Sequence, residues 1–494
     1  MDDPSTQTIK ILTHLSKTLS LSPPQSTHPP ATLTGLPTSH TGTAYLFLSV
    51  SAHHPRLQIH SYPAIHWARA YISNIPTPSA PISLPSSTQE TARDIPVLGL
   101  LSDDLAGPAI RACVTKDLLH VRKFLAILSL VLEHIISSNA NANSSSSSAP
   151  MSNSSTTMDL DAPEPTTTST PPLPSCLLHG LAGTLYLLRL IRHWVPSSAP
   201  LVCGAIVHVS EYLLGPHPWT CPSRSPTSSQ SYSHSHSPSS PSPPPPEDTH
   251  GTTHGDLGIL TQLVLTSPPL AASPVLTSRL AALLDLQLPN GDWPAPSTTS
   301  PSPHSQPSQS EIQQALDAPP TPTQQKPAAK SSPRPPRGFA SGPQGLVLSL
   351  LSLRPFFPSL HDRTDDAVEK AREFLWARAV DSDVPAEDVN LFYGSLSTAL
   401  TFPKGPKRTH LLAQQPPSPN QPLSPPTNTG TNTNTNITTS RNPSTPSPSA
   451  SSSSTTPTTP PTAGSVTTAP HPGSAYLHAV AERDMPRMIF YNDI

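Results

Sequence analysis

Hydrophobic residues recur along this chain in Leu-rich stretches whose spacing predicts helices. Between Leu118 and Leu132, apolar side chains fall at i, i+3 and i+4, so they share one face of a helix. Runs of β-branched residues that alternate with polar ones are scarce. Comparable stretches without proline are 44–50, 123–136, 184–194, 201–214, 259–265, 346–353 and 367–377. The pattern predicts that the ordered part of the chain is all-helical.

Blocks rich in Pro, Ser and Thr separate these stretches. The chain contains 69 Pro in 494 residues, well above the usual share of ~5 %. The blocks lie near residues 137–175, 222–249, 295–337 and 414–472. They hold too few large apolar side chains to offset the entropy lost on folding, so we expect disorder there. We expect a helical core over residues 1–413 with three disordered inserts, a disordered segment at 414–472, and a residual C-terminal segment at 473–494.

Charge and cysteine content exclude several classes of partner. The chain has 28 Lys and Arg against 31 Asp and Glu, a net charge of −3, and no basic block. This balance predicts no nucleic-acid partner and no anionic membrane surface. Apolar runs fall short of the ~18 residues that a membrane span needs, so we expect no transmembrane segment. Sparse cysteines without a C-x-x-C pair are typical of a reduced, cytoplasmic protein.

A glycine signature recurs at the start of the Leu-rich stretches. Its clearest copies are His-Gly-Leu-Ala-Gly (179–183), His-Gly-Asp-Leu-Gly (254–258), Ser-Gly-Pro-Gln-Gly (341–345) and Tyr-Gly-Ser-Leu (393–396), with weaker ones at Gly42 and Gly107. Without the Pro/Ser-rich blocks, the copies recur at roughly 45 residues, the size of a helical hairpin repeat. Six or seven such hairpins would close into an α/α toroid.

Two interpretations of these glycines remain open from the sequence. Bare backbone at helix N-termini, where N–H groups lack partners, would let the helix starts crowd around a central cavity and favour an anionic or polarised ligand. Alternatively, the glycines only allow close packing of helices. In the first interpretation, the cavity-lining residues are Gly180, Gly183, Gly255, Gly258, Gly342, Gly345 and Gly394.

Taken together and in order, five motifs resemble those of lanthionine synthetase C-like proteins. They are His-Gly-Leu-Ala-Gly (179–183), His-Gly-Asp-Leu-Gly-Ile (254–259), Asn-Gly-Asp-Trp-Pro (290–294), Gly-Pro-Gln-Gly (342–345) and Phe-Tyr-Gly-Ser (392–395). Longer phrases at 183–196 and 346–358 are similar to the family's fungal branch. The resemblance implies a toroid of seven hairpins around a zinc ion. In the family, the metal lowers the pKa of a thiol, whose thiolate attacks the β-carbon of a dehydrated Ser or Thr to give a thioether.

The chain departs from the family at the zinc ligands. The resemblance places two cysteines and a histidine at positions where this chain has Ala340, Phe392 and Tyr393. Alanine and phenylalanine carry no donor atom, and a tyrosine phenol has a pKa of about 10, so none is a credible ligand. The neighbouring glycines are kept. We therefore expect a member of the family that has lost its zinc and binds no cofactor.

Histidines offer the remaining candidate chemistry. His254 matches the family's acid/base histidine and could exchange a proton near neutral pH; the alternative is an imidazole satisfied by backbone at a helix start. His250 stands at i, i+4 from His254, a spacing that suits a metal on a helix. Adjacent glycines disfavour that helix, and no third ligand is near in the sequence. Asn290–Gly291 is either a turn or part of the cavity rim.

These observations lead to one expected function and two alternatives. We expect a zinc-less, catalytically impaired lanthionine synthetase C-like protein that binds a peptide or a small thiol such as glutathione in the toroid cavity. One alternative is an enzyme that adds thiols through His254 alone. The other is a regulatory scaffold that recruits partners through its Pro-rich segments, including an SH3-type contact at 332–337. No seventh hairpin is evident, which predicts an open seam with exposed apolar flanks.

Overall fold

Helices make up most of the structure, a computed structural model. It describes residues 4–25, 34–73, 98–145, 172–221, 250–294, 338–380, 390–392, 396–414, 465–466, 469–485 and 487–494. Within these residues, the one sheet is a short antiparallel hairpin in which β1 (Gln58–Ile59) pairs with β2 (Tyr62–Pro63). The prediction of a helical ordered part is confirmed at this level.

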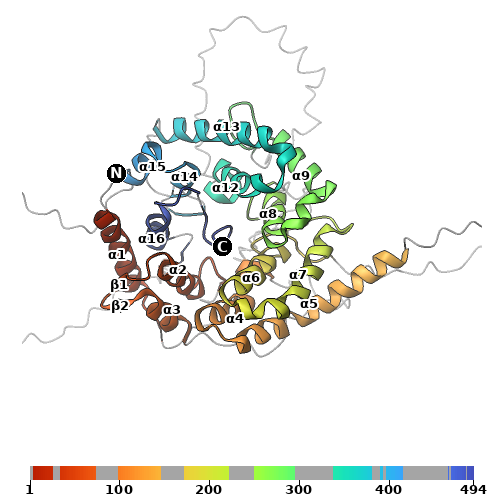
Figure 1. The fold of residues 1–494 in the computed structure, drawn as a ribbon, viewed down its shortest axis with the longest axis horizontal. Helices are drawn as coiled ribbons and strands as arrows, with labels where there is room; N and C mark the ends of the chain where they lie inside the picture. Colours follow the sequence, from red (N-terminus) through yellow and green to blue (C-terminus); the bar gives the residue numbers. More distant parts are fainter. Residues whose placement is uncertain are drawn as a thin grey trace, which may run out of the picture.

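The described helices alternate between an inner and an outer layer (Figure 1). The inner ones are α2 (His40–His53), α4 (Asp103–Thr115), α6 (Leu181–Trp194), α8 (Asp256–Thr266), α12 (Pro343–Leu353), α14 (Leu396–Thr401) and α16 (Pro470–Val480). The outer ones are α1 (Pro4–Leu21), α3 (Ala64–Ser73), α5 (Leu118–Ser145), α7 (Ala199–Leu214), α9 (Pro274–Asp285), α13 (His361–Val380) and α15 (Pro406–Ala413). Short turns complete the set: η2 (Gly99–Leu101), η3 (Pro196–Ser198), η4 (Pro268–Ala272), α11 (Gly338–Ser341), η5 (Arg354–Phe356) and η6 (Pro358–Leu360).

Residue patterns explain which helix lies in which layer. In α6, every residue from Leu181 to Ile191 is buried, because an inner helix is covered on all sides. The outer helix α13 buries a single stripe that recurs at helical spacing. That stripe consists of Thr364, Ala367, Val368, Ala371 and Leu375. The inner α6 is thus covered on all sides along most of its length, whereas the outer α13 turns one apolar stripe toward the layer beneath it.

The inner helices contact one another in chain order, and α16 contacts α2, so the described helices form a closed ring (Figure 1). The place next to α2 is filled by α16, which packs against α1 as its outer partner. Gln7 of α1 donates from Nε2 to the His478 carbonyl of α16 at 2.6 Å. The expected open seam is not found among these helices, because the first and last described helices pair with each other.

Order extends further into the Pro/Ser-rich blocks than composition predicted. Residues 137–145 continue α5, since extending a formed helix is easier than starting one. Leu173 is buried, and its N–H donates to the Tyr212 hydroxyl at 3.1 Å. Ser465 and Val466 are buried as well. The expected block at 414–472 also overlaps α16, which begins at Pro470. Most of the remaining residues of the blocks, including the SH3-type motif at 332–337, lie outside the described residues.

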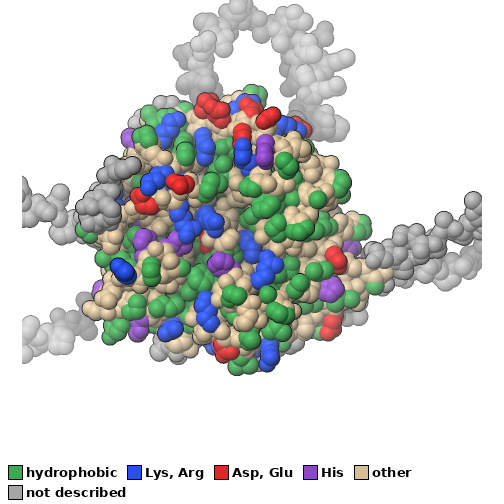
Figure 2. Space-filling model, in the orientation of Figure 1, with side chains coloured by type: hydrophobic (Ala, Val, Ile, Leu, Met, Phe, Trp, Pro, Cys, Tyr) green, Lys and Arg blue, Asp and Glu red, His purple; other side chains and the backbone are tan. Residues whose placement is uncertain are grey.

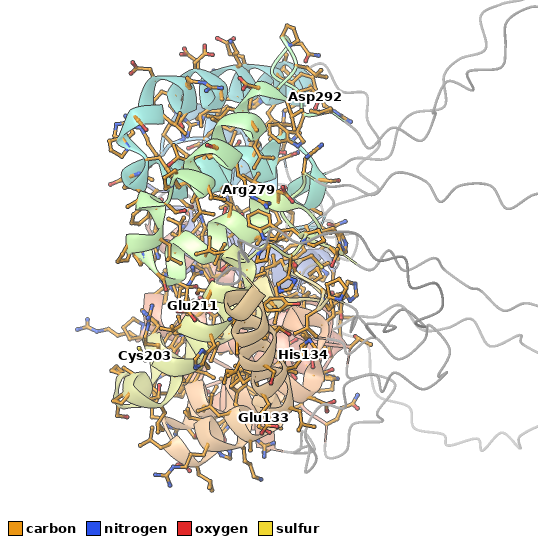
Figure 3. All side chains as sticks on the ribbon, turned by 90° about the vertical axis from the view of Figure 1, so that its right-hand side faces the viewer. Glu133, His134, Cys203, Glu211, Arg279 and Asp292 are labelled. Atoms are coloured by element: carbon orange, nitrogen blue, oxygen red, sulfur yellow. The ribbon has the colours of Figure 1, made fainter. Side chains whose placement is uncertain are left out.

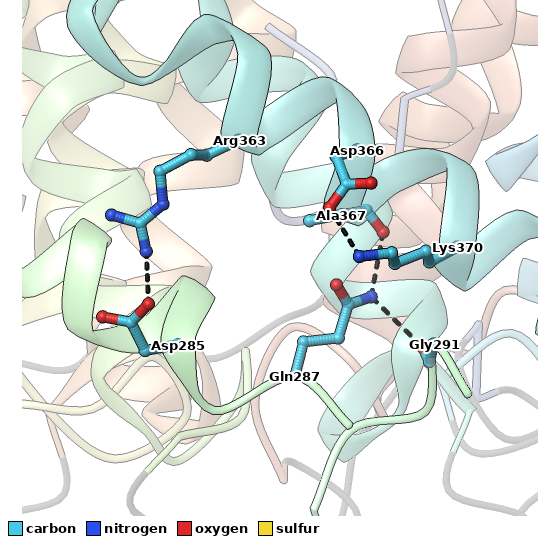
Figure 4. A network of polar contacts seen from close by, with 7 residues as sticks. All are labelled: Asp285, Gln287, Gly291, Arg363, Asp366, Ala367 and Lys370. Atoms are coloured by element: carbon cyan, nitrogen blue, oxygen red, sulfur yellow. Dashed lines mark hydrogen bonds and ion pairs between the residues drawn. The ribbon is translucent and has the colours of Figure 1, made fainter. Parts of the chain in front are cut away.

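A polar network joins the loop after α9 to α13 (Figure 4). Gln287 donates from Nε2 to the carbonyl oxygens of Gly291, at 3.2 Å, and Ala367, at 2.9 Å. Asn290 accepts the Asp292 N–H at 3.0 Å, and Gly291 has a φ of +84°. Asn290–Gly291 is therefore a turn packed on the outer helix α13.

One described helical stretch, Pro196–Leu214, is long and apolar enough to cross a membrane by length and composition. Its helix α7 packs against α5 and α6 and buries Val202, Ile206 and Val209, as a core helix does. The described residues thus contain no clear transmembrane segment. Figure 2 shows Lys, Arg and His side chains around the middle of one face of the ring, where Figure 1 places the C-terminus.

Candidate functional site

The glycine signature marks places where the backbone crosses itself. A Cβ on the second glycine of a copy would lie about 2 Å from a carbonyl oxygen six residues earlier. The distances are 1.8 Å from Gly42 to Leu36, 2.0 Å from Gly183 to Leu177, 1.9 Å from Gly258 to Thr252 and 2.1 Å from Gly345 to Phe339. No side chain fits in such a space, so glycine is required there for close approach.

The loops that lead into the inner helices are joined to one another by backbone hydrogen bonds. Each donates an N–H to a carbonyl of the next. The bonds run from Leu36 to Leu100 (2.7 Å), Leu100 to Leu177 (3.3 Å), Leu177 to Thr253 (3.1 Å), Thr253 to Ala340 (3.3 Å) and Ala340 to Phe392 (3.0 Å). We call the surface formed by these loops, residues 34–39, 98–102, 172–180, 250–255, 338–342 and 390–392, the corner face.

Most of the predicted cavity-lining glycines face packed backbone instead of a cavity. A Cβ at any of them would meet backbone atoms closer than 3 Å. This holds for Gly180, Gly183, Gly255, Gly258 and Gly345. Gly342 is the N-cap of α12, and Gly394 lies outside the described residues. The contacts at these five positions therefore favour the close-packing interpretation.

The first amides of α6 are also less available than the sequence suggested. Leu181 donates its N–H to the Pro174 carbonyl at 2.9 Å, and Ala182 donates to the Ser175 carbonyl at 3.1 Å. The loop before the helix thus caps its N-terminus. An anion would have to displace these bonds to bind there.

The centre of the ring is filled by the C-terminal tail, residues 488–494. Met488, Ile489, Phe490 and Tyr491 are fully buried. The Tyr491 carbonyl accepts hydrogen bonds from inner helices, from Arg189 at 2.6 Å and from Gln262 at 3.1 Å. The shared hollow expected from the sequence is occupied by these residues.

A buried carboxylate anchors the end of the tail. Asp493 accepts hydrogen bonds from the hydroxyls of Tyr45 on α2, at 2.7 Å, and Tyr186 on α6, at 3.0 Å. Burial raises the pKa of Asp493, and the two hydroxyls and the Arg189 guanidinium oppose that rise. The tail is therefore tied to inner helices on different sides of the ring.

The positions of the family's zinc ligands do not fit a metal. Ala340 and Phe392 are buried and offer no side-chain donor. The Phe392 ring lies 5.2 Å from the Phe339 ring, which in turn packs edge-on against Tyr491 of the tail at 4.9 Å. Tyr393 lies outside the described residues. Aromatic packing against the tail thus surrounds a position where the resemblance implies a ligand.

Three ligand-type side chains meet elsewhere, two on the corner face and one from the segment beside it. Cys176 lies in the loop before α6, Cys221 follows α7, and His254 precedes α8. The Cys221 Sγ lies 2.8 Å from the Cys176 Sγ and 3.1 Å from the His254 Nδ1. Cys176 is buried, whereas Cys221 and His254 are half-buried. We call these three residues the thiol–imidazole cluster.

Backbone hydrogen bonds hold the three segments of the cluster together. Ser175, next to Cys176, donates its N–H to the carbonyl of Thr220, next to Cys221, at 2.7 Å. Leu177 and Leu178 donate to the carbonyl of Thr253, next to His254, at 3.1 and 3.3 Å. The cluster therefore lies where the loop before α6, the loop before α8 and the segment after α7 are hydrogen-bonded to one another.

Arg279 of α9, labelled in Figure 3, contacts both the segment that leads to Cys221 and the segment that follows His254. Its guanidinium lies 3.6 Å from the centre of the Trp219 ring, two residues before Cys221. It also pairs with the carboxylate of Asp256, two residues after His254, at 3.5 Å. One side chain thus fixes the approach of the cysteine and the histidine.

The surroundings of Cys176 favour its thiolate. The pKa of Cys176 is lowered by a hydrogen bond from the Cys221 thiol, and further by His254 and the backbone N–H of His179, although burial opposes these effects. The His179 ring stacks on His254 with centres 5.8 Å apart. Two sulfurs and an imidazole in this arrangement are suited to nucleophilic sulfur chemistry or to metal coordination.

The sequence motifs single out His254 as a candidate but not its partners Cys176 and Cys221. Cys221 is 45 residues from Cys176 and 33 from His254. The sequence suggested no third ligand for a site formed by His250 and His254; in space, loop crossings bring two cysteines to His254. A usable signal was present: Cys176 lies three residues before the His179–Gly180 signature.

No protein-family model matches this chain, and no curated protein matches its sequence.

Proposed function

We propose that this chain is a lanthionine synthetase C-like protein, an α/α toroid that binds a peptide or a small thiol such as glutathione at its corner face. The ring of paired helices and the order of the motifs support the family. The observation that carries the proposal is the convergence of Cys176, Cys221 and His254 at loops bearing the glycine signature. Catalysis at positions 340 and 392 is not part of the proposal, since neither side chain has a donor.

The ligand would bind at the corner face because the centre of the ring is filled. Cys221 and His254 are half-buried, so a small molecule reaches them without displacing the tail. An incoming sulfur meets the groups that already stabilise a thiolate at Cys176: a thiol, an imidazole and the His179 N–H. These donors recognise a thiol compound or the sulfur of a peptide.

Calorimetric titration of the full chain with reduced glutathione tests this proposal. We expect saturable binding that is weakened about tenfold or more by Cys176→Ser or His254→Ala. Cys203→Ser is the matched control, because Cys203 is exposed on the outer helix α7, away from the cluster (Figure 3). Absence of binding of glutathione and of a dehydroalanine peptide, or binding that neither Cys176→Ser nor His254→Ala weakens, would reject the proposal.

A second candidate function is catalysed thiol addition through His254. The His254 Nδ1 lies 3.1 Å from a thiol sulfur, which is hydrogen-bond reach for a general base. A thiolate sulfur would bond to the β-carbon of dehydroalanine, and a proton would go to the α-carbon. Mass spectrometry of glutathione and a dehydroalanine peptide should then show a thioether that is lost in His254→Ala. No product with the unmodified protein would exclude this function.

A further inference from the structure

We propose that Cys176, Cys221 and His254 form a binding site for one zinc-type metal ion, with a fourth coordination position left open. Among the described residues, these side chains place three ligand atoms within 4.8 Å of one another. The site differs in every residue from positions 340, 392 and 393. It also does not require that a peptide or glutathione bind the protein.

The donor set selects the class of metal. Two thiolates and one imidazole are soft to borderline ligands, which favour zinc or cobalt over magnesium or calcium. Two thiolates also carry two negative charges in a partly buried place, and a divalent cation neutralises them. Three protein ligands with one open position is the arrangement found in catalytic zinc sites.

The spacing of the ligand atoms leaves room for an ion after a small adjustment. The two sulfurs are 2.8 Å apart, longer than a disulfide bond of ~2.05 Å. Thiolates that share a tetrahedral zinc at ~2.3 Å lie ~3.7 Å from each other. Cys221 is half-buried, so rotation of its side chain supplies the difference. The His254 Nδ1 also contacts the Cys221 sulfur, and a disulfide between the two cysteines would give no reason for an imidazole at this place.

Groups around the cluster hold the ligands as metal sites require. The His179 N–H donates to the Cys176 sulfur, which stabilises a thiolate. Backbone bonds from Ser175 to Thr220 and from Leu177 to Thr253 fix the three ligand segments. Arg279 positions the residues that flank Cys221 and His254. The ligands are thus oriented by neighbours before any ion arrives.

Cobalt loading tests the site. The full chain is purified under reducing conditions, stripped with a chelator, and titrated with Co²⁺. We expect one Co²⁺ per chain by elemental analysis and a thiolate-to-cobalt charge-transfer absorption that Zn²⁺ abolishes. Cys176→Ser, Cys221→Ser and His254→Asn should each weaken binding about tenfold or more, while Cys203→Ser should not. Circular dichroism confirms that each variant is folded.

Several results would overturn the inference. They are a folded, fully reduced protein without the charge-transfer band, binding that survives Cys176→Ser and Cys221→Ser, and a Cys176–Cys221 disulfide that persists in excess reductant. Glutathione titration of the metal-free chain is a separate measurement. Binding of cobalt without binding of glutathione would support the metal site and reject the proposed function. Binding of glutathione without binding of cobalt would support the proposed function and reject the metal site.

Discussion

The centre of the ring and the corner face differ in how far their polar groups are buried. In the centre, the C-terminal tail is buried and hydrogen-bonded to side chains of α2, α6, α8 and α12. At the edge of the corner face, Cys221 and His254 are half-buried, and each contacts another member of the thiol–imidazole cluster. Completed packing marks a structural region, and partly exposed reactive donors mark a functional one.

Two buried cysteines, Cys113 and Cys176, show the same contrast, because their pKa values shift in opposite directions. Burial raises the pKa of Cys113 on α4, where it packs in the core. Hydrogen bonds lower the pKa of Cys176 although it is also buried. Burial alone therefore keeps a thiol inert, whereas a neighbouring thiol, imidazole and N–H favour its reactive form.

Removing residues 491–494 should have the largest effect. The truncation deletes the buried Tyr491 ring and leaves the buried Arg189 without its carbonyl partner. We expect the free energy of unfolding to fall by more than about 4 kcal/mol, measured by urea denaturation. The milder Tyr491→Phe removes only the hydroxyl bonded to Ser349 and should cost about 1 kcal/mol. A truncated chain of unchanged stability would show that the tail does not complete the centre.

A methyl group at a corner glycine should have the next largest effect. Gly258→Ala would place its Cβ 1.9 Å from the Thr252 carbonyl, so the corner must shift. We expect a loss of about 1–3 kcal/mol in urea denaturation. Gly204→Ala on the exposed side of α7 is the control, with no atom within 4 Å. We expect Gly204→Ala to increase the free energy of unfolding by about 0.5–1 kcal/mol. Equal effects of the two substitutions would contradict the close-packing interpretation.

Acid should destabilise the packing of α1 against α16. Burial, then the charges of His471 and Lys10, lowers the pKa of His14 to about 4. The folded state thus favours the neutral imidazole. The stability that this preference supports is complete above pH ~6.5 and is lost as the pH falls through 4, by about 3 kcal/mol. Urea denaturation at several pH values should show this loss, and His14→Gln should reduce it. The same pH dependence in both proteins would contradict this assignment.

The smallest effect on stability is expected at the cluster itself. Cys221→Ser keeps the shape of a half-buried side chain and should change the free energy of unfolding by less than about 1 kcal/mol. The same substitution should strongly weaken cobalt binding. A large loss of stability in the metal-free protein would instead assign the cluster to the core.

Local patterns in the sequence predicted much of the fold. The spacing of apolar residues indicated the helices, and the glycine signature marked the starts of α6, α8 and α12. The cluster and the pairing of α1 with α16 depend on contacts between distant segments, which no local period encodes. The tail carries neither a repeat nor a helical period, so its place in the ring could not be inferred from residues 488–494 alone.

The pairing of α1 with α16 has a consequence for biosynthesis. Gln7 and His478, which join the two helices, are 471 positions apart. A chain emerging from the ribosome therefore exposes the apolar stripe of its first helix until nearly all later helices have been made. Closure of the ring between α1 and α16 therefore cannot precede the synthesis of α16, and the unfinished chain carries exposed apolar surface until then.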